Sequence, residues 1–165
     1  MNAFINSKDN LQIIAAKTET QFRVAKQLFI AYQQFLGEDL CFQGFDAELA
    51  QLSTMYAAPN GTLLLAVHNG AYVACVAFRK KGDGICEMKR LYVTEAYKQK
   101  GIGRLLVEKI IEKAKNAGYK KMILDTLNRL QPALKLYHSF GFKETNAYYA
   151  NPLRDVIYME LNLAG

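Results

Sequence analysis

The sequence predicts an α+β fold in which a mixed, mostly antiparallel sheet of about six to seven strands is flanked by helices. Three observations support this fold class. Apolar runs of strand length and segments of helical periodicity follow each other in the order strand, two helices, three strands, helix, strand, helix, two strands. An Asn-Gly pair joins two of the apolar runs, as in an antiparallel hairpin. The 165 residues are 51% hydrophobic, so we expect one core and a single domain spanning residues 1–165.

The N-terminal third of the chain predicts one strand followed by two helices. Residues 11–17 form a short apolar run of strand length. In residues 18–36 apolar side chains recur at helical spacing, with Thr18 or Thr20 as the N-cap and Gly37 as the stop. Residues 45–56 show a weaker helical pattern.

The middle of the chain predicts three consecutive strands. Residues 62–67 and 72–78 are apolar runs, and the four residues from His68 to Ala71 between them contain the Asn-Gly pair. A second turn, at residues 80–84, leads into a third run at residues 85–93. We therefore expect two antiparallel strands and then a third strand.

The C-terminal half predicts two helices and three further strands. A long amphipathic helix opens at Gly101 and ends at Gly118, and residues 121–125 form the next strand. Pro132 suits the first turn of a second helix, which runs to about Phe140 and ends at Gly141. The last two strands are predicted at residues 142–149 and 156–163.

Composition excludes several classes of protein. The longest apolar run, residues 61–67, is far shorter than the roughly 20 residues that span a bilayer. The first eight residues lack the basic and apolar regions of a secretory signal, so we expect a cytoplasmic protein without a membrane partner. Cys41, Cys75 and Cys86 form no Cys-x-x-Cys pair, which argues against a disulfide framework and a thiolate zinc site. We expect all three to be small buried side chains.

The net charge of +6 is unevenly distributed along the chain. Residues 79–121 contain 13 Lys and Arg against five Asp and Glu, a surplus of +8. Within this segment Lys98, Lys100 and Arg104 surround the predicted start of a helix, where the helix dipole disfavours cations in the absence of an anion. A phosphorylated ligand would resolve this conflict, because its oxygens accept from the unpaired N–H groups of the first helical turn. A solvated basic loop is the alternative.

Other phosphate motifs and metal sites do not fit the sequence. No Gly-x-x-x-x-Gly-Lys-Ser/Thr segment is present, and Gly101-Ile102-Gly103 lacks the third glycine and the later acidic residue of a dinucleotide-binding turn. His68 and His138 have no nearby Cys, Asp or Glu cluster, so no metal is expected. The basic segment also lacks the interleaved aromatic residues of an RNA-binding motif, which argues against a nucleic-acid partner.

The segment Lys98-Gln99-Lys100-Gly101-Ile102-Gly103 resembles the acetyl-CoA pyrophosphate loop of the GCN5-related N-acetyltransferase (GNAT) superfamily, Arg/Gln-x-x-Gly-x-Gly/Ala, with Lys98 in place of Arg or Gln. Residues 87–93 resemble the central strand of that family. Residues 133–142 resemble its Ala-x-x-x-Tyr-x-x-x-Gly-Phe signature. The three motifs keep the family's order and jointly cover about residues 60–163. The resemblance implies the GNAT-like (acyl-CoA N-acyltransferase) fold and acetyl-CoA as co-substrate.

The resemblance also assigns cofactor contacts. They are Leu91, Tyr92, Val93, Lys98, Gln99, Lys100, Gly101, Ile102, Gly103 and Arg104. In the family the pantetheine arm pairs with the exposed edge of the central strand, and a backbone N–H near Val93 would polarise the thioester carbonyl. Many members carry a cofactor-contacting Asn three residues before the position of Ala133, where this chain has Leu130, and Asn128 lies two positions away.

Two catalytic roles follow from the same resemblance. Glu87 matches the general base of the histone-acetylating members, and strand alternation places it on one face with Lys89 and Leu91. Burial on a central strand would raise the pKa of Glu87 toward a useful value, although a salt bridge is the alternative interpretation. Tyr137 matches the general acid that protonates the leaving thiolate, and an aromatic anchor against the sheet is its alternative interpretation.

The sequence leaves the acceptor open. Tyr148, Tyr149 and Asn151 lie where the family borders its acceptor cleft, so they are candidate substrate contacts, with aromatic strand packing as the alternative. A small amine, an amino acid, a polyamine or a protein amine would each fit, and a homodimer is compatible with the resemblance. We therefore expect an acetyl-CoA-dependent N-acetyltransferase acting by direct transfer; the rival hypothesis is a non-catalytic acyl-CoA-binding regulatory module.

Overall fold

A seven-stranded sheet runs through the computed structural model, which describes residues 10–164. Its strand order is β1-β2-β3-β4-β5-β7-β6, and only the β4 and β5 pair is parallel. The strands are β1 (Leu11–Ala15), β2 (Gly61–His68), β3 (Ala71–Gly82), β4 (Ile85–Val93), β5 (Lys121–Leu127), β6 (Lys143–Thr145) and β7 (Val156–Asn162). The predicted α+β class and mostly antiparallel sheet are confirmed. Residues 1–8, from which we expect no secretory signal, lie outside the described residues.

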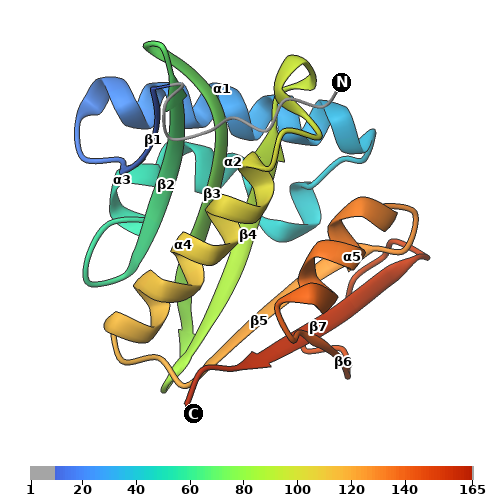
Figure 1. Cartoon of the computed structure of the whole chain (residues 1–165). Helices are drawn as coiled ribbons and strands as arrows, with labels where there is room; N and C mark the ends of the chain where they lie inside the picture. The colour runs from blue at the N-terminus through green and yellow to red at the C-terminus, as the bar shows by residue number, and fades with distance from the viewer. Residues whose placement is uncertain (1–9, 165) are drawn as a thin grey trace.

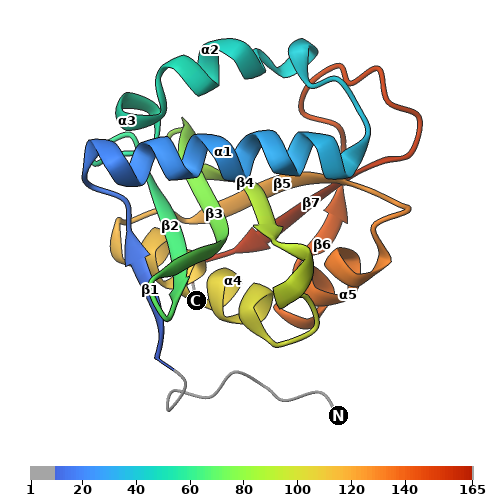
Figure 2. The ribbon, with the colours of Figure 1, turned by 90° about the horizontal axis from the view of Figure 1, so that it is seen from above.

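Helices cover both faces of the sheet. Figure 2 shows α1 and α2 on one face and α4 and α5 on the other. The helices are α1 (Glu19–Leu36), α2 (Phe45–Ala50), α3 (Leu52–Met55), α4 (Ile102–Asn116) and α5 (Gln131–Ser139), with single 3-10 turns at Cys41–Gln43 and Glu95–Tyr97. None of the helices between residues 10 and 164 combines the length and apolarity needed to cross a membrane.

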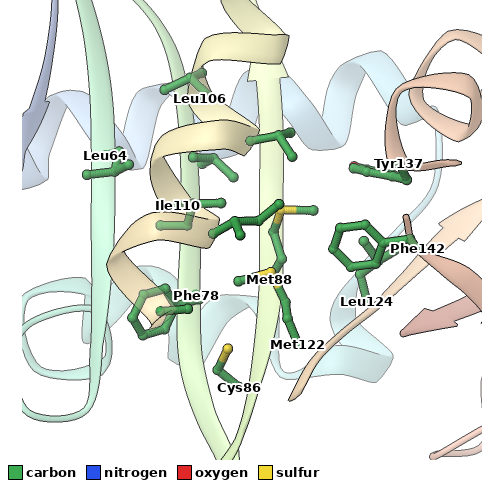
Figure 3. Packing of buried hydrophobic residues seen from close by; sticks show 14 of the residues in the cluster. Leu64, Phe78, Cys86, Met88, Leu106, Ile110, Met122, Leu124, Tyr137 and Phe142 are labelled. Atoms are coloured by element: carbon green, nitrogen blue, oxygen red, sulfur yellow. The ribbon is translucent and has the colours of Figure 1, made fainter. Parts of the chain in front are cut away.

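Each face of the sheet has its own core. Between the sheet and α4 and α5, Leu64 and Phe78 meet Leu106 and Ile110, as Figure 3 shows. On the other face, buried side chains from α1, α2 and α3 pack against β2 and β3. Cys75 and Cys86 are buried as expected, but Cys41 is exposed because it begins the 3-10 turn after α1.

Local signals account for most element boundaries. The Thr18 side chain caps α1 and forms a capping box with Gln21, and Gly37 ends the helix with φ of 69°. The single helix expected over residues 45–56 is instead two short helices, because the chain leaves helical geometry at Gln51. The strand expected over residues 142–149 is also too long.

The last part of that predicted strand is a loop because its side chains bind elsewhere. Of residues 142–149, only Lys143–Thr145 pair with β7. Beyond them, the Tyr148 and Tyr149 hydroxyls donate hydrogen bonds to Glu87 and Asp125. The loop therefore folds back over Glu87 of β4 and Asp125 of β5 instead of continuing along the sheet.

The feature that shapes the functional site is a bulge in β4. Cys75 pairs with Tyr92 and Ala77 with Lys89, so two residues of β4 stand against one residue of β3. The extra residue is Arg90, whose φ is 61°. Pairing of β4 with β5 ends at Glu87, and beyond it the two strands diverge, as Figure 1 shows.

Candidate active site

A cleft of about 720 Å³ opens where β4 and β5 diverge. Its walls come from the second half of β4, the start of α4, the end of β5, the start of α5 and the C-terminal end of α1. The apolar part of the wall includes Tyr32, Leu36, Leu40, Leu127, Leu130 and Leu153. Such a concave, largely apolar site with few polar groups is the usual form of a small-molecule site.

The wall formed by β4 carries free backbone groups. The Thr94 N–H donates to Val73 O at 2.9 Å, on the β3 side. Because successive N–H groups point to opposite edges of a strand, the Val93 N–H points to the edge facing the cleft. Within residues 10–164 that edge has no strand partner after Glu87. An extended ligand can therefore pair with β4 as a further strand would.

The start of α4 leaves several backbone N–H groups without helical partners. Gln99 and Gly101 have φ of 61° and 84°, and such left-handed residues in a loop turn successive N–H groups inward. The first bond of the helix runs from Leu105 N–H to Gly101 O, so the three N–H groups before Leu105 have no helical partner. The N-cap residue Gly101 has no side chain that could cap the helix, and the first turn contains no acidic residue.

The cations around this helix start contact acceptor groups and aromatic rings of the protein. Lys98 forms an ion pair with Glu95 at 2.9 Å, and its ammonium lies 3.8 Å from the centre of the Phe35 ring. Arg104 donates to Ser139 Oγ at 3.0 Å. Aromatic rings and acceptors thus reduce the conflict with the helix dipole that the sequence alone suggests. Lys98 and Arg104 still line the cleft.

Tyr137 lies on the α5 side of the cleft. Its residue is 7% exposed, and its ring packs edge-on against Phe142 with 5.7 Å between ring centres. Burial raises the pKa of the phenol, so the hydroxyl stays protonated at neutral pH. Tyr137 therefore packs as an aromatic anchor against Phe142 and also forms part of the cleft wall.

Glu87 occupies a different position from the one expected. It lines a smaller neighbouring cavity of about 190 Å³ and not the main cleft. Its Oε1 accepts from Arg79 Nε at 3.0 Å, and its Oε2 accepts from the Tyr148 hydroxyl at 2.7 Å. Burial alone would raise the pKa of Glu87, but the Lys89 charge, the Tyr148 hydrogen bond and Arg79 lower it below the ordinary value. The expected rise in pKa is wrong.

The bulge also changes which residues share a face. Glu87 and Lys89 both point to the α2 side, where Lys89 Nζ lies 3.9 Å from Glu87 Oε1. Leu91 instead packs with the core beneath α4 and α5. The expectation that Leu91 shares a face with Glu87 is wrong, because the extra residue Arg90 shifts the alternation by one.

Arg90 itself is held in a buried polar network. Its Nε and NH2 donate to the two carboxylate oxygens of Glu48 at 2.9 and 2.8 Å, and its NH1 donates to Gln43 Oε1 at 2.9 Å. Arg90 and Glu48 are 5% and 2% exposed. The guanidinium also lies over the Phe45 ring at 5.1 Å. Three residues that follow α1 in the chain, Gln43, Phe45 and Glu48, thus hold the bulge in place.

The candidate acceptor residues form a second polar group. The Tyr149 hydroxyl, Gln43 Nε2 and Asn151 Nδ2 all donate to Asp125 Oδ2, at 2.5, 3.3 and 3.3 Å. Asp125 lines the main cleft, whereas Tyr149 lines the smaller cavity. Tyr148 contacts Glu87 and does not line either cavity. The predicted substrate contacts therefore do not line the main cleft; they donate hydrogen bonds to the carboxylates of Asp125 and Glu87.

Most of the predicted cofactor contacts gather on the cleft wall. They are Leu91, Val93, Lys98, Gln99, Gly101, Ile102, Gly103 and Arg104. Tyr92 instead packs against Tyr32 and Phe35 on the other side of the sheet, and Lys100 lies over the Tyr97 ring. Leu130 lines the cleft.

Sequence reasoning missed several polar side chains of the cleft wall, among them Gln43, Lys89 and Asp125. Asp125 had a visible signal, since a carboxylate directly follows three buried apolar residues of β5. Gln43 had none, because it lies in an irregular turn.

The sequence of this chain is similar to those of known proteins from one family. A family model described as Acetyltransferase (GNAT) family matches residues 26–142. An uncharacterised N-acetyltransferase from Schizosaccharomyces pombe is 43% identical over 157 residues, covering 94% of this chain and 96% of that protein.

Two solved structures have a similar fold. An acetyltransferase of the GNAT family from Staphylococcus aureus has a TM-score of 0.77 at 20% identity, over 93% of this chain and 99% of that one. A GNAT family acetyltransferase from Elizabethkingia anophelis, solved with acetyl-CoA bound, has a TM-score of 0.69 at 25% identity, over 93% of this chain and 99% of that one.

Proposed function

Because the chain belongs to the acetyltransferase (GNAT) family, we propose that it transfers the acetyl group of acetyl-CoA directly to a primary amine of a small molecule or a protein. The observation that carries the proposal is the cleft between β4 and β5. It connects an anion-binding helix start with a free strand edge and with Tyr137. These three features suit, in order, the pyrophosphate, the pantetheine arm and the thioester of acetyl-CoA.

Different residues of the cleft act in the successive steps of acyl transfer. The amine nitrogen attacks the thioester carbonyl carbon, and the Val93 N–H donates to the oxygen that becomes negative. As the tetrahedral intermediate collapses, the carbon–sulfur bond breaks and Tyr137 gives its proton to the leaving thiolate. The products are the acetylated amine and free CoA, and the proton lost by the amine balances the one that Tyr137 regains.

The amine must be neutral to attack, since an ammonium has no lone pair. Glu87 does not line the main cleft, so we propose that it takes the proton of the ammonium through a water molecule in the smaller cavity and releases it to solvent. That cavity is polar and large enough for water. The lowered pKa of Glu87 keeps its carboxylate ionised at neutral pH, and it also makes that carboxylate a weaker base than an ordinary Glu.

Calorimetry with acetyl-CoA tests the first step. A proline at position 103 removes one of the three free N–H groups of α4, so Gly103→Pro should weaken acetyl-CoA binding about 10- to 100-fold. Gly103→Ala is the matched control, because its Cβ would meet Leu136 and Val93 at the ordinary contact distances of 3.6 and 4.0 Å and its N–H is kept. Absence of saturable binding by the wild type, or equal binding by Gly103→Pro, would contradict the proposal.

The rival function is an acyl-CoA-binding regulatory module without catalysis. A pure binder needs neither a carboxylate near the thioester nor an acid beside the leaving sulfur. Acetyl-CoA binding without release of CoA thiol in the presence of any amine would support this second function.

A further inference from the structure

Lys89 is a buried cation that the proposed chemistry does not use. Its side chain is 5% exposed, and it lines both the main cleft and the smaller cavity. The carboxylate oxygens nearest to its ammonium are Glu48 Oε1 and Glu87 Oε1, at 3.8 and 3.9 Å. Both distances exceed hydrogen-bond length. A buried ammonium normally finds hydrogen-bonded partners, and within residues 10–164 the Lys89 ammonium has none, so its N–H groups can donate to a ligand.

The surroundings of Lys89 carry excess positive charge. Among the residues that the structure describes, Arg79, Lys81 and Lys89 border the smaller cavity together with one carboxylate, that of Glu87. The stronger contacts of the two carboxylates near Lys89 go elsewhere, since Glu87 accepts from Arg79 at 3.0 Å and Glu48 binds Arg90 through two hydrogen bonds. A carboxylate entering from the cleft would therefore meet an ammonium whose two ion pairs, with Glu48 and Glu87, are long and shared with arginines.

Asp125 supplies the opposite charge in the same cleft. Among the described residues, its hydrogen bonds from Tyr149, Gln43 and Asn151 all end on Oδ2. They fix the orientation of the carboxylate and leave Oδ1 to a ligand, because Asp125 lines the cleft. Gln43 also lines both cavities, and its Nε2 donates to Asp125 Oδ2.

We propose that the acceptor is an amine that also carries a carboxylate, such as a free amino acid, with its amine at Asp125 and its carboxylate at Lys89. This proposal rests on the proposed acetyl transfer and narrows its acceptor class. Binding the carboxylate at Lys89 supplies the hydrogen bonds that this ammonium lacks, and Asp125 holds the amine end for attack on the thioester. Two charged groups of opposite sign in one cleft select against simple amines, since an unpaired Lys89 would then be buried.

Matched acceptor pairs test the proposal. The twenty protein L-amino acids are compared with amines of the same side chain that lack the carboxylate, for example L-leucine with 3-methylbutylamine, by CoA thiol release. For the preferred amino acid, kcat/KM should exceed that of its matched amine by about 10- to 100-fold, the effect of a hydrogen bond between charged groups. Lys89→Met should bring this ratio close to one. Lys80→Met, which removes an exposed lysine from β3, should keep the ratio.

Each outcome decides the question. Equal rates for the two members of every pair, or a ratio that persists in Lys89→Met, would overturn the acceptor class while leaving acetyl transfer intact. Transfer to neither set, with acetyl-CoA still bound, would overturn it as well. Loss of acetyl-CoA binding in the wild type would be a failure of the proposed function itself. Lys89→Gln provides a second variant if circular dichroism shows Lys89→Met to be unfolded, and the wild-type ratio depends on no variant.

Discussion

Replacing Glu48 by Gln should destabilise the protein more than any exposed ion-pair substitution. Glu48 is 2% exposed and accepts two hydrogen bonds from Arg90, at 2.9 and 2.8 Å. Arg90 is itself 5% exposed. A Gln side chain can still accept one of the two bonds, but it leaves the buried guanidinium without a counter-charge.

The expected size of the effect follows from this burial. Breaking a buried ion pair by removing one partner costs about 3–5 kcal/mol. Since the amide of the Glu48→Gln variant would keep one hydrogen bond, we expect a loss near the lower limit, about 3 kcal/mol in the free energy of unfolding. For a chain of 165 residues this corresponds to a fall in Tm of roughly 6–12 °C.

Urea unfolding followed by circular dichroism measures the loss, with Glu19→Gln as the matched control. Glu19 pairs with Arg23 at 3.3 Å, but the two side chains are 91% and 68% exposed, so that variant should lose less than about 0.5 kcal/mol. In addition, Arg90→Met should cost less in the Glu48→Gln background than in the wild type. A Glu48→Gln protein as stable as Glu19→Gln would refute the reasoning.

The pH dependence of the same pair has a defined sign. Burial alone would raise the pKa of Glu48, but its hydrogen bonds and ion pair with Arg90 bring the pKa below the ordinary value of 4.5. The stabilisation by the pair is therefore complete above the unfolded-state pKa and is lost as the pH falls through the folded-state pKa. The stability difference between wild type and Glu48→Gln should shrink accordingly on acidification.

Two further predictions concern the cleft. Tyr137→Phe and Glu87→Gln should each lower kcat by about 10²-fold or more, with the Kd for acetyl-CoA within about threefold of wild type, and full turnover in both would remove their catalytic roles. Lys89→Met should raise the free energy of unfolding at pH 7, because burial, and next the Arg90 charge, lower the pKa of Lys89 from 10.5 to about 8. Below pH 8 the lysine is charged in both states and destabilises the fold, and this penalty is relieved as the pH rises from 8 to 10.5. The gain in Lys89→Met should therefore diminish over that range in denaturation at several pH values, and a variant less stable than wild type at pH 7 would contradict it.

Features that depend only on residues close together in the chain were predictable from the sequence. The Asn69-Gly70 pair is sufficient to indicate the β2 and β3 hairpin, and the glycines around residue 102 indicate the helix start that borders the cleft. Both signals act within a few residues of the chain. The position of Tyr137 on the cleft wall followed from a motif of the same local kind.

The bulge at Arg90 could not be predicted in this way. Strand alternation places Glu87 and Leu91 on one face, and no glycine or proline at the bulge signals otherwise. The residue that stabilises the bulge is Glu48, more than forty positions earlier in the chain. Asp125 is similar, because its hydrogen-bond partners Gln43 and Tyr149 come from loops that approach each other only in the folded protein.

Stability and activity should therefore be coupled through one residue. Arg90 is the extra residue of β4, and the divergence of β4 from β5 begins just before it. We therefore expect the contacts that hold Arg90 to set the free strand edge at Val93 and the orientation of Lys89 as well. An exposed ion pair could be lost without effect on this geometry, but loss of Glu48 removes the counter-charge of the bulge itself. For this reason Glu48→Gln should lower acetyl transfer even at temperatures where the variant remains folded, although Glu48 does not line the cleft.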